Sequence, residues 1–141
     1  MKEEISTDAA VIDGTSEQTH GQKAHISTVA ALNKLEQAGG VRSVLLFEHG
    51  TLQIKMYTPR SPNGELIDPQ TPHLRDELYV VAEGRGTFFN GKTRRACDTG
   101  DLLFAPAGSE HRFEDFTEDF AVWVMFYGPN GGEENPVCPP I

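Results

Sequence analysis

The stretch that decides the fold is GDLLFAPAGSEHRFED, residues 100–115. Its apolar residues 102–105 predict a short strand that ends at Pro106-Ala107-Gly108, because proline and glycine interrupt strands and form turns. His111 follows this turn, where a second strand is expected over residues 112–116. The stretch therefore predicts two strands joined by a turn, with an imidazole at the start of the second strand.

A second stretch, PQTPHLRDELYVVAEGRG, residues 69–86, holds the other candidate ligands. His73 and Glu77 are four residues apart, so an extended chain places both side chains on one face. Tyr79 continues this face, and the turn before His111 would allow its imidazole to reach the same point. Two imidazoles and one carboxylate suit one divalent metal ion such as Fe(II), Mn(II), Ni(II), Zn(II) or Co(II).

The rest of the chain reads as one helix followed by short strands. The helix is expected at Thr28–Gln37, between a cap at Ser27 or Thr28 and a stop at Gly39-Gly40. The further strands are expected over residues 43–48, 52–58, 78–82, 87–89, 92–96 and 121–127. Short strands separated by frequent turn residues predict an all-β sandwich or barrel, with the helix packed outside it.

The distribution of aromatic residues marks the folded body. All eight Phe, three Tyr and the single Trp lie between Phe47 and Tyr127, and aromatic side chains supply much of a small core. We therefore expect a polar acidic arm over residues 1–26, the helix region over 27–40, the barrel over 41–128 and a Gly/Pro-rich tail over 129–141.

Composition and charge exclude several classes of function. The 141 residues suit one domain. The net charge of −9 argues against partners with a negative surface, namely nucleic acid and anionic membranes. The start of the chain does not read as a secretory signal, and the longest apolar run is far shorter than the ~20 residues that span a bilayer. With Cys97 and Cys138 read as free thiols, these features predict a cytoplasmic protein.

The two stretches resemble the motifs of the cupin superfamily. Its second motif, G-x5-P-x-G-x2-H-x3-N, is matched in register by Gly100, Pro106, Gly108 and His111, with Asp115 at the Asn position. The end of its first motif, E-x6-G, is matched by Glu77 and Gly84. The resemblance covers residues 41–128 and implies a cupin β-barrel, also called a double-stranded β-helix.

The first motif departs from the family pattern at one ligand position. Cupins normally carry two His before the Glu, and in this register the pair falls on Thr71 and His73. The resemblance thus implies a site of His73, Glu77 and His111 that is completed by the amide oxygen of Gln70 or by water. The alternative is a degenerate cupin whose polar pocket residues bind no metal.

Other side chains are candidates for contact with a substrate. Gln53, Lys55 and Tyr57 share one face of a strand, and they line the pocket if the aliphatic face opposite packs outside the barrel. Tyr57 and Tyr79 are then the candidate catalytic residues. Arg75 would share a strand face with His73 and Glu77, so it could bind an anionic substrate. We favour the alternative, in which it forms a surface salt bridge with Asp76 or Glu114. His20, His25 and His49 are assigned no role.

The resemblance implies a metalloenzyme that acts on a small organic molecule. It is either dioxygenase-like, with Fe(II), or isomerase-like, with Glu77 or Tyr79 moving a proton. A non-catalytic small-molecule-binding module is the main alternative. A metal-free sugar-nucleotide epimerase is disfavoured because the acidic chain is a poor host for a doubly anionic nucleotide. Small cupins usually pair, so we also expect a homodimer.

Overall fold

The computed structural model describes residues 25–61 and 63–134, and the statements below concern those residues. The chain divides into two units, residues 1–30 and 31–141. In the first unit, the hydroxyl of Ser27 accepts the backbone N–H of Ala30 (3.0 Å) and so caps the start of the helix. The elements in chain order are α2 (Thr28–Gln37), β1 (Ser43–His49), β2 (Leu52–Tyr57), β3 (Asp76–Glu83), β4 (Arg85–Phe89), β5 (Arg94–Asp98), β6 (Leu102–Ala105), β7 (Arg112–Glu114) and β8 (Ala121–Tyr127).

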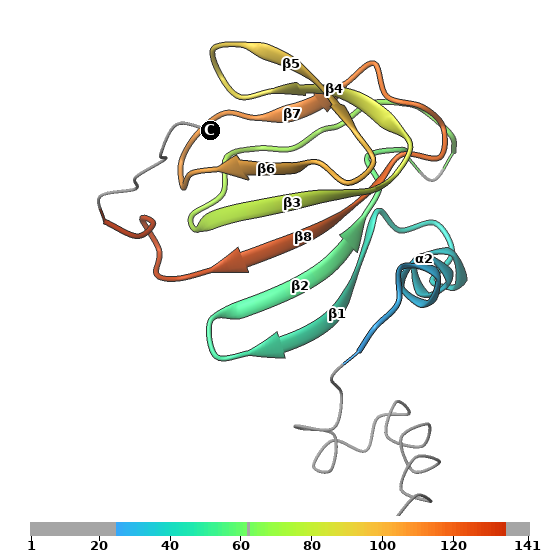
Figure 1. The fold of residues 1–141 in the computed structure, drawn as a ribbon, viewed down its shortest axis with the longest axis horizontal. Coiled ribbons are helices and arrows are strands. Elements are labelled where there is room, and N and C mark those ends of the chain that lie inside the picture. Colours follow the sequence, from blue (N-terminus) through green and yellow to red (C-terminus); the bar gives the residue numbers. More distant parts are fainter. Residues whose placement is uncertain (1–24, 62, 135–141) are drawn as a thin grey trace, which may run out of the picture. The chain divides into compact units, whose positions relative to one another are not determined.

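The strands form two antiparallel sheets (Figure 1). One has five strands in the order β1-β2-β8-β3-β6, and the other has three in the order β5-β4-β7. The buried core draws on both sheets, with Tyr79 and Val122 from the larger one and Phe88 and Phe113 from the smaller one. The core therefore lies between the two sheets, and the all-β fold expected from the sequence is confirmed.

The register of the larger sheet identifies its inner face, because directly opposed residues of neighbouring strands point the same way. The buried side chains of Val122 and Val124 place the inner face of β8 on the core. Three cross-strand rows over β2, β8 and β3 share that face: Gln53, Phe126 and Glu77 form the first, Lys55, Val124 and Tyr79 the second, and Tyr57, Val122 and Val81 the third. The polar face of β2 thus points inward.

Two strand ends differ from the expected ones in ways that affect the site. β3 begins at Asp76, two residues before the expected start, so Glu77 lies within the strand. β7 ends at Glu114 because Asp115 adopts φ 50°, a left-handed backbone that terminates the pairing. Asp and Asn tolerate this conformation better than other non-glycine residues, which explains why Asp115 can stand where the family pattern has Asn.

The expectations for the two ends of the chain and for one cysteine concern residues that the structure does not describe. Residues 1–24 of the expected arm, residues 135–141 of the expected tail and Cys138 lie outside the described residues. Cys97 is a buried free thiol in the core, and burial raises its pKa. No helix in the described part of the chain is long and apolar enough to cross a membrane.

Gly84, between β3 and β4, gives a test of the packing. Its φ is +78°, and an added Cβ would lie 2.9 Å from the Cα of Phe120. Gly100 has a similar φ of +96° but open space around it. Both alanine variants strain the backbone, and only Gly84→Ala also places a Cβ too close to Thr117, Asp119 and Phe120. We expect Gly84→Ala to lower the free energy of unfolding by about 1–3 kcal/mol more than Gly100→Ala does. Equal losses in urea unfolding would contradict the packing described.

Candidate metal centre

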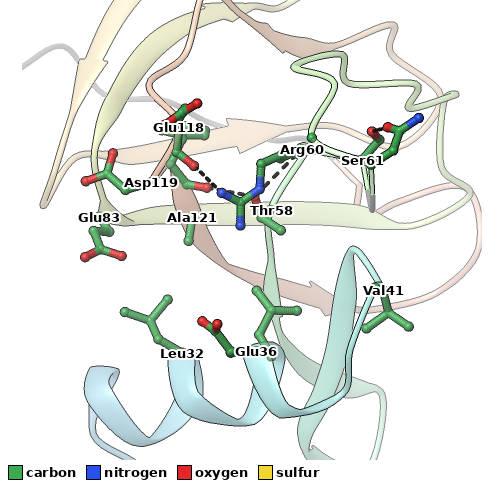
Figure 2. A pocket seen from close by; sticks show the side chains of 15 residues that line it. Leu32, Glu36, Val41, Thr58, Arg60, Ser61, Glu83, Glu118, Asp119 and Ala121 are labelled. Carbon is green, nitrogen blue, oxygen red and sulfur yellow. Dashed lines mark hydrogen bonds between the residues drawn. The ribbon is translucent and has the colours of Figure 1, made fainter.

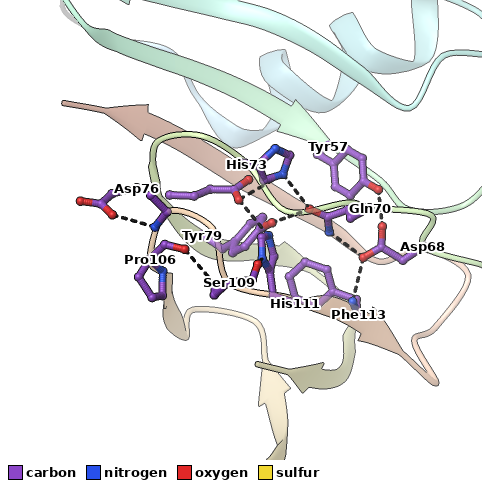
Figure 3. A network of polar contacts seen from close by, with 12 residues as sticks. Tyr57, Asp68, Gln70, His73, Asp76, Tyr79, Pro106, Ser109, His111 and Phe113 are labelled. Carbon is purple, nitrogen blue, oxygen red and sulfur yellow. Dashed lines mark hydrogen bonds and ion pairs between the residues drawn. The ribbon is translucent and has the colours of Figure 1, made fainter. Parts of the chain in front are cut away.

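His73, Glu77 and His111 come together at one point. Figure 3 shows the two imidazoles of this cluster. Their donor atoms all lie within 4.8 Å of one another. Nε2 of His111 is 3.0 Å from Oε1 of Glu77, and Nε2 of His73 is 3.4 Å from the same oxygen. Glu77 belongs to β3 of the larger sheet, whereas His111 immediately precedes β7 of the smaller one. The cluster therefore joins the two sheets.

The backbone around the Pro106-Ala107-Gly108 turn holds both imidazoles in place. The N–H of Gly108 donates to the carbonyl of His73 (2.8 Å), so the turn fixes the segment before β3. The carbonyl of Ser109 lies 3.0 Å from Nδ1 of His111. Because this contact occupies Nδ1, the imidazole presents Nε2 to the cluster, an orientation that hydrogen bonding commonly imposes on metal-binding histidines.

The reason for the position of His73 differs from the one expected. His73 and Glu77 were expected to share a strand face, but β3 begins only at Asp76. His73 lies in the bent segment before the strand, and its ring packs edge-on against Phe126, with the ring centroids 5.0 Å apart. The predicted convergence is present, and it depends on that aromatic contact and on the hydrogen bond from Gly108.

Burial and charge at the cluster fit a divalent cation. The side chains of Glu77 and His111 are 2% and 1% exposed, whereas that of His73 is 31% exposed. Among the described residues, the ion-pair partners of the Glu77 carboxylate are the two imidazoles, with no Lys or Arg. A buried carboxylate is costly without a compensating positive charge. Two imidazole nitrogens and a carboxylate oxygen are also a donor set that divalent transition metals accept.

The two histidines have pKa values shifted in opposite directions. Burial lowers the pKa of His73, and the positive charges of His111 and Lys55 act in the same direction. For His111, burial favours the neutral form, but the hydrogen bonds to Glu77 and Ser109 together with the charge of Glu77 raise its pKa. His73, the more exposed of the two, is therefore the imidazole that more readily stays neutral.

Gln70 lies beside the cluster with its amide oxygen directed toward it (Figure 3). Its Oε1 is 3.3 Å from Nε2 of His73 and accepts the hydroxyl of Tyr79 at 2.8 Å. Its Nε2 donates to Asp68 at 2.6 Å. Because the amide nitrogen is held by a carboxylate, the amide oxygen is the atom presented to His73.

Asp68 is a central residue of the site that the sequence did not reveal. Its side chain is buried, and it accepts hydrogen bonds from the Tyr57 hydroxyl (2.5 Å), the Gln70 amide (2.6 Å) and the backbone N–H of Phe113 (2.7 Å). Nothing in its sequence context separates it from the other 20 of the 21 acidic residues. Its partners at Tyr57 and Phe113 are distant in the chain, and only the folded structure brings them together.

The two tyrosines expected to contact a substrate are both hydrogen-bond donors in this network. Burial, followed by the charge of Asp68, raises the pKa of Tyr57 far above its usual range. Burial and the charge of Glu77 likewise raise the pKa of Tyr79. Both phenols therefore keep their protons at neutral pH. Tyr79 is next to the cluster, whereas the hydroxyl of Tyr57 is taken up by Asp68.

Arg75 does not form the expected surface salt bridge. Its guanidinium donates to the carbonyl of Thr51 (2.5 Å) and to Oε1 of Gln53 (3.0 Å). Asp76 instead accepts the backbone N–H of Ala107 (2.9 Å). The other expected partner, Glu114, pairs with Arg94 and Arg112. Strand parity predicted that Arg75 lies on the same side of the chain as the ligands. Its hydrogen bonds to Thr51 and Gln53 hold the guanidinium at the edge of β2.

The remaining histidines stay apart from the cluster. His49 is exposed at the end of β1, and His25 is exposed before α2. His20 lies outside the described residues.

A separate hollow of about 680 Å³ lies beside the C-terminal half of α2 and the segment that leads into β8 (Figure 2). Its charged lining consists of Arg60 and four acidic residues, namely Glu36, Glu83, Glu118 and Asp119. Nη1 of Arg60 donates to the carbonyl of Glu118 at 2.8 Å. None of the clustered ligand candidates lines this hollow, so it is distinct from the candidate metal centre.

Comparison with known proteins shows which family the region of the site matches. The family model described as a cupin domain matches residues 60–127, which include both motifs of the site. Residues 60–127 are therefore identified as a cupin domain. Two solved cupin structures share the fold with a TM-score of 0.51 each. A cupin-2 domain containing protein from Shewanella frigidimarina is 16% identical, with 72% of this chain and 96% of that chain covered. A cupin 2 conserved barrel domain protein from Salinispora arenicola is 17% identical, with 66% and 84% covered.

A curated relative is more similar in sequence over a shorter span. An uncharacterized protein of Streptomyces coelicolor is 37% identical over 62 residues, which cover 44% of this chain and 59% of the relative. This chain therefore matches less than two thirds of that relative's length.

Asp68 provides a test of the polar network in this cupin domain. Replacing it with Ala removes the acceptor of three hydrogen bonds and leaves the buried N–H of Phe113 without a partner. We expect Asp68→Ala to lower the free energy of unfolding by about 2–5 kcal/mol. The control is Asp98→Ala, which changes an exposed residue of β5. A loss in urea unfolding no larger than that of the control would contradict the assigned network.

Proposed function

We propose that this cupin domain binds one divalent metal ion through His73, Glu77 and His111 and acts as a metal-dependent enzyme on a small organic molecule. The observation that carries the proposal is the Glu77 carboxylate, which is 2% exposed and lies between two imidazoles without a Lys or Arg partner among the described residues. The metal is Fe(II), Mn(II), Ni(II) or Zn(II), all of which accept this donor set.

When bound, such a metal would supply Lewis-acid polarisation of substrate oxygens and, in the case of Fe(II), redox chemistry with dioxygen. The substrate would enter from the side of His73, because that imidazole is the most exposed of the three candidate ligands. Gln70 presents its amide oxygen on the same side, where it or a water molecule completes the ligand set. The hydroxyl of Tyr79 donates to this amide oxygen (2.8 Å) and would hold it in position beside the cluster.

The state of the acid and base groups favours the dioxygenase-like form of this proposal over the isomerase-like form. An isomerase needs a base that takes a proton from the substrate. Glu77 is held by two imidazoles, and Asp68 accepts three hydrogen bonds. Tyr79 keeps its proton because its pKa is raised. None of these three groups is a free base, so none of them would take the proton that the isomerase-like reaction requires.

The expected homodimer stays a prediction, and the outer face of the larger sheet supports it. Apolar residues form cross-strand rows on that face, with Ile54, Met125, Leu78 and Phe104 in one row and Trp123, Val80 and Leu102 in the next, whose fourth member, Met56, is already buried within the chain. Leu102 is 63% exposed. Burial of such a face against a second copy would be favourable because it removes apolar surface from water. The cytoplasmic location likewise stays a prediction.

Metal analysis of untagged protein tests the proposed centre. The wild-type protein is expected to bind one divalent ion per chain, as measured by mass spectrometry of the metal after dialysis. His111→Ala removes a buried ligand and should abolish this binding, while Gln70→Ala should weaken the affinity by roughly tenfold or more. His49→Ala is the matched control, since His49 is exposed and far from the cluster in the chain, and it should leave the metal content unchanged.

Oxygen uptake by the Fe(II)-loaded protein then tests the reaction. Enols, diketones and catechols are offered in turn, and consumption of dioxygen is expected with Fe(II) and not with Zn(II) or with His111→Ala. Stoichiometric iron that binds these compounds without turnover would contradict the enzyme and favour the non-catalytic binding module. Failure of the wild-type protein to take up any of the four metals would contradict the centre itself.

A further inference from the structure

Lys55 is a cationic side chain on the inner face of the larger sheet. It lies in β2, in the same cross-strand row as Val124 and Tyr79, and it is half-buried. Its Nζ is 5.6 Å from the centre of the Phe126 ring, within the range of a cation–π contact. Among the described residues, no carboxylate lies within ion-pair distance of Nζ. The ammonium group is therefore turned inward without a counter-ion from that part of the chain.

The Phe126 ring connects Lys55 to the candidate metal centre. Phe126 lies opposite Glu77 in the register of β8 and β3, and the His73 ring packs edge-on against it at 5.0 Å between centroids. Lys55 and His73 thus contact the same aromatic ring. Because His73 is the exposed member of the cluster, the ammonium group borders the side from which a substrate would approach.

A second cation near this ring is already engaged. The guanidinium carbon of Arg75 is 5.9 Å from the centre of Phe126, but its nitrogens donate to Thr51 and Gln53. Lys55 has no such acceptors among the described residues. A half-buried ammonium has lost part of its hydration, and a charge-assisted hydrogen bond from an anionic ligand would replace what it has lost. In a chain with a net charge of −9, an inward lysine without a carboxylate partner is distinctive.

We propose that Lys55 forms an anion subsite, so that the substrate is a small molecule bearing a carboxylate. The carboxylate would lie at Nζ of Lys55, while another oxygen of the same molecule would face the cluster of His73, Glu77 and His111. The contact with Lys55 does not depend on a metal, whereas the contact with the cluster rests on the proposed metal-dependent function. A single free ammonium beside Phe126 matches one negative charge, and this favours a carboxylate over a doubly charged phosphate.

The test uses two probes of nearly equal shape, 3,4-dihydroxyphenylacetate and 3,4-dihydroxyphenylacetamide. Both carry a metal-chelating catechol, and they differ only in the charge at the other end. Binding to the Zn(II)-loaded protein is measured by calorimetry, because zinc does not oxidise the catechol. We expect the acid to bind wild-type protein roughly tenfold more tightly than the amide. This preference should decrease as the salt concentration rises.

Lys55→Met removes the charge and keeps an unbranched side chain that is one atom shorter. In this variant the preference for the acid should vanish, while Lys55→Arg should retain it in part. The matched control is Lys92→Met, which changes an exposed lysine in the turn between β4 and β5 and should leave the preference intact. Lys55→Met should bind zinc as wild type does, because Lys55 is not a ligand of the proposed centre.

The proposal is overturned if wild-type protein binds both probes equally, if neither probe binds, or if the preference survives Lys55→Met. Zinc titration of the same preparations is read separately. Failure of wild-type protein to bind zinc or any of the other three metals contradicts the proposed function, and the two probes are then compared on metal-free protein. If metal-free protein shows no preference for the acid over the amide, the anion subsite is overturned as well. If it prefers the acid, Lys55 is retained as an anion-binding group.

Discussion

The contact between Glu77 and His111 is the interaction on which the rest of the site depends. It joins β3 of the larger sheet to the segment that enters β7 of the smaller sheet, and both side chains are almost fully buried. A carboxylate in such a place has to be matched by hydrogen bonds and positive charge, or the fold is destabilised. The surrounding backbone meets this requirement, since the Ser109 carbonyl orients His111 and the Gly108 N–H holds the segment that carries His73.

A second carboxylate, that of Asp68, organises the donors around this contact. It ties the long connection between β2 and β3 to the backbone of Phe113 and orients the amide of Gln70. The two acidic residues thus have different tasks that follow from their partners. Glu77 faces imidazoles and is available to a cation, whereas Asp68 faces N–H and O–H donors and is saturated by them. Phe126 lies beside this arrangement, where its ring contacts His73 and is approached by the cations Lys55 and Arg75.

Much of this arrangement was predictable where local sequence determines local structure. Pro106, Gly108 and His111 fix a turn and an imidazole within a few residues, and the alternation of β3 places Glu77 and Tyr79 on the buried face. The position of His73 was predicted from a strand face shared with Glu77. The chain instead bends before β3, and contact with Phe126 holds the ring in place.

Other features depended on contacts between distant parts of the chain. Both faces of β8 are apolar, so only its pairing with β2 and β3 shows which one is internal. The same pairing places Lys55 inside, a choice that the sequence of β2 alone left open. Asp68 acquires its importance from partners up to 45 residues away. The acceptors of Arg75 are likewise distant in the chain, since Thr51 lies in the turn before β2 and Gln53 lies in β2. Such contacts leave no local pattern in the sequence.

Diffraction from crystals of the metal-loaded protein, recorded on both sides of the metal's absorption edge, tests whether these three side chains hold the metal. We expect a single anomalous peak with Nε2 of His73, Nε2 of His111 and a carboxylate oxygen of Glu77 each about 2.0–2.3 Å away. The metal would then replace the direct contact between Glu77 and His111. A peak at any other group of side chains, or no peak while Glu77 and His111 remain hydrogen-bonded to each other, would contradict the account.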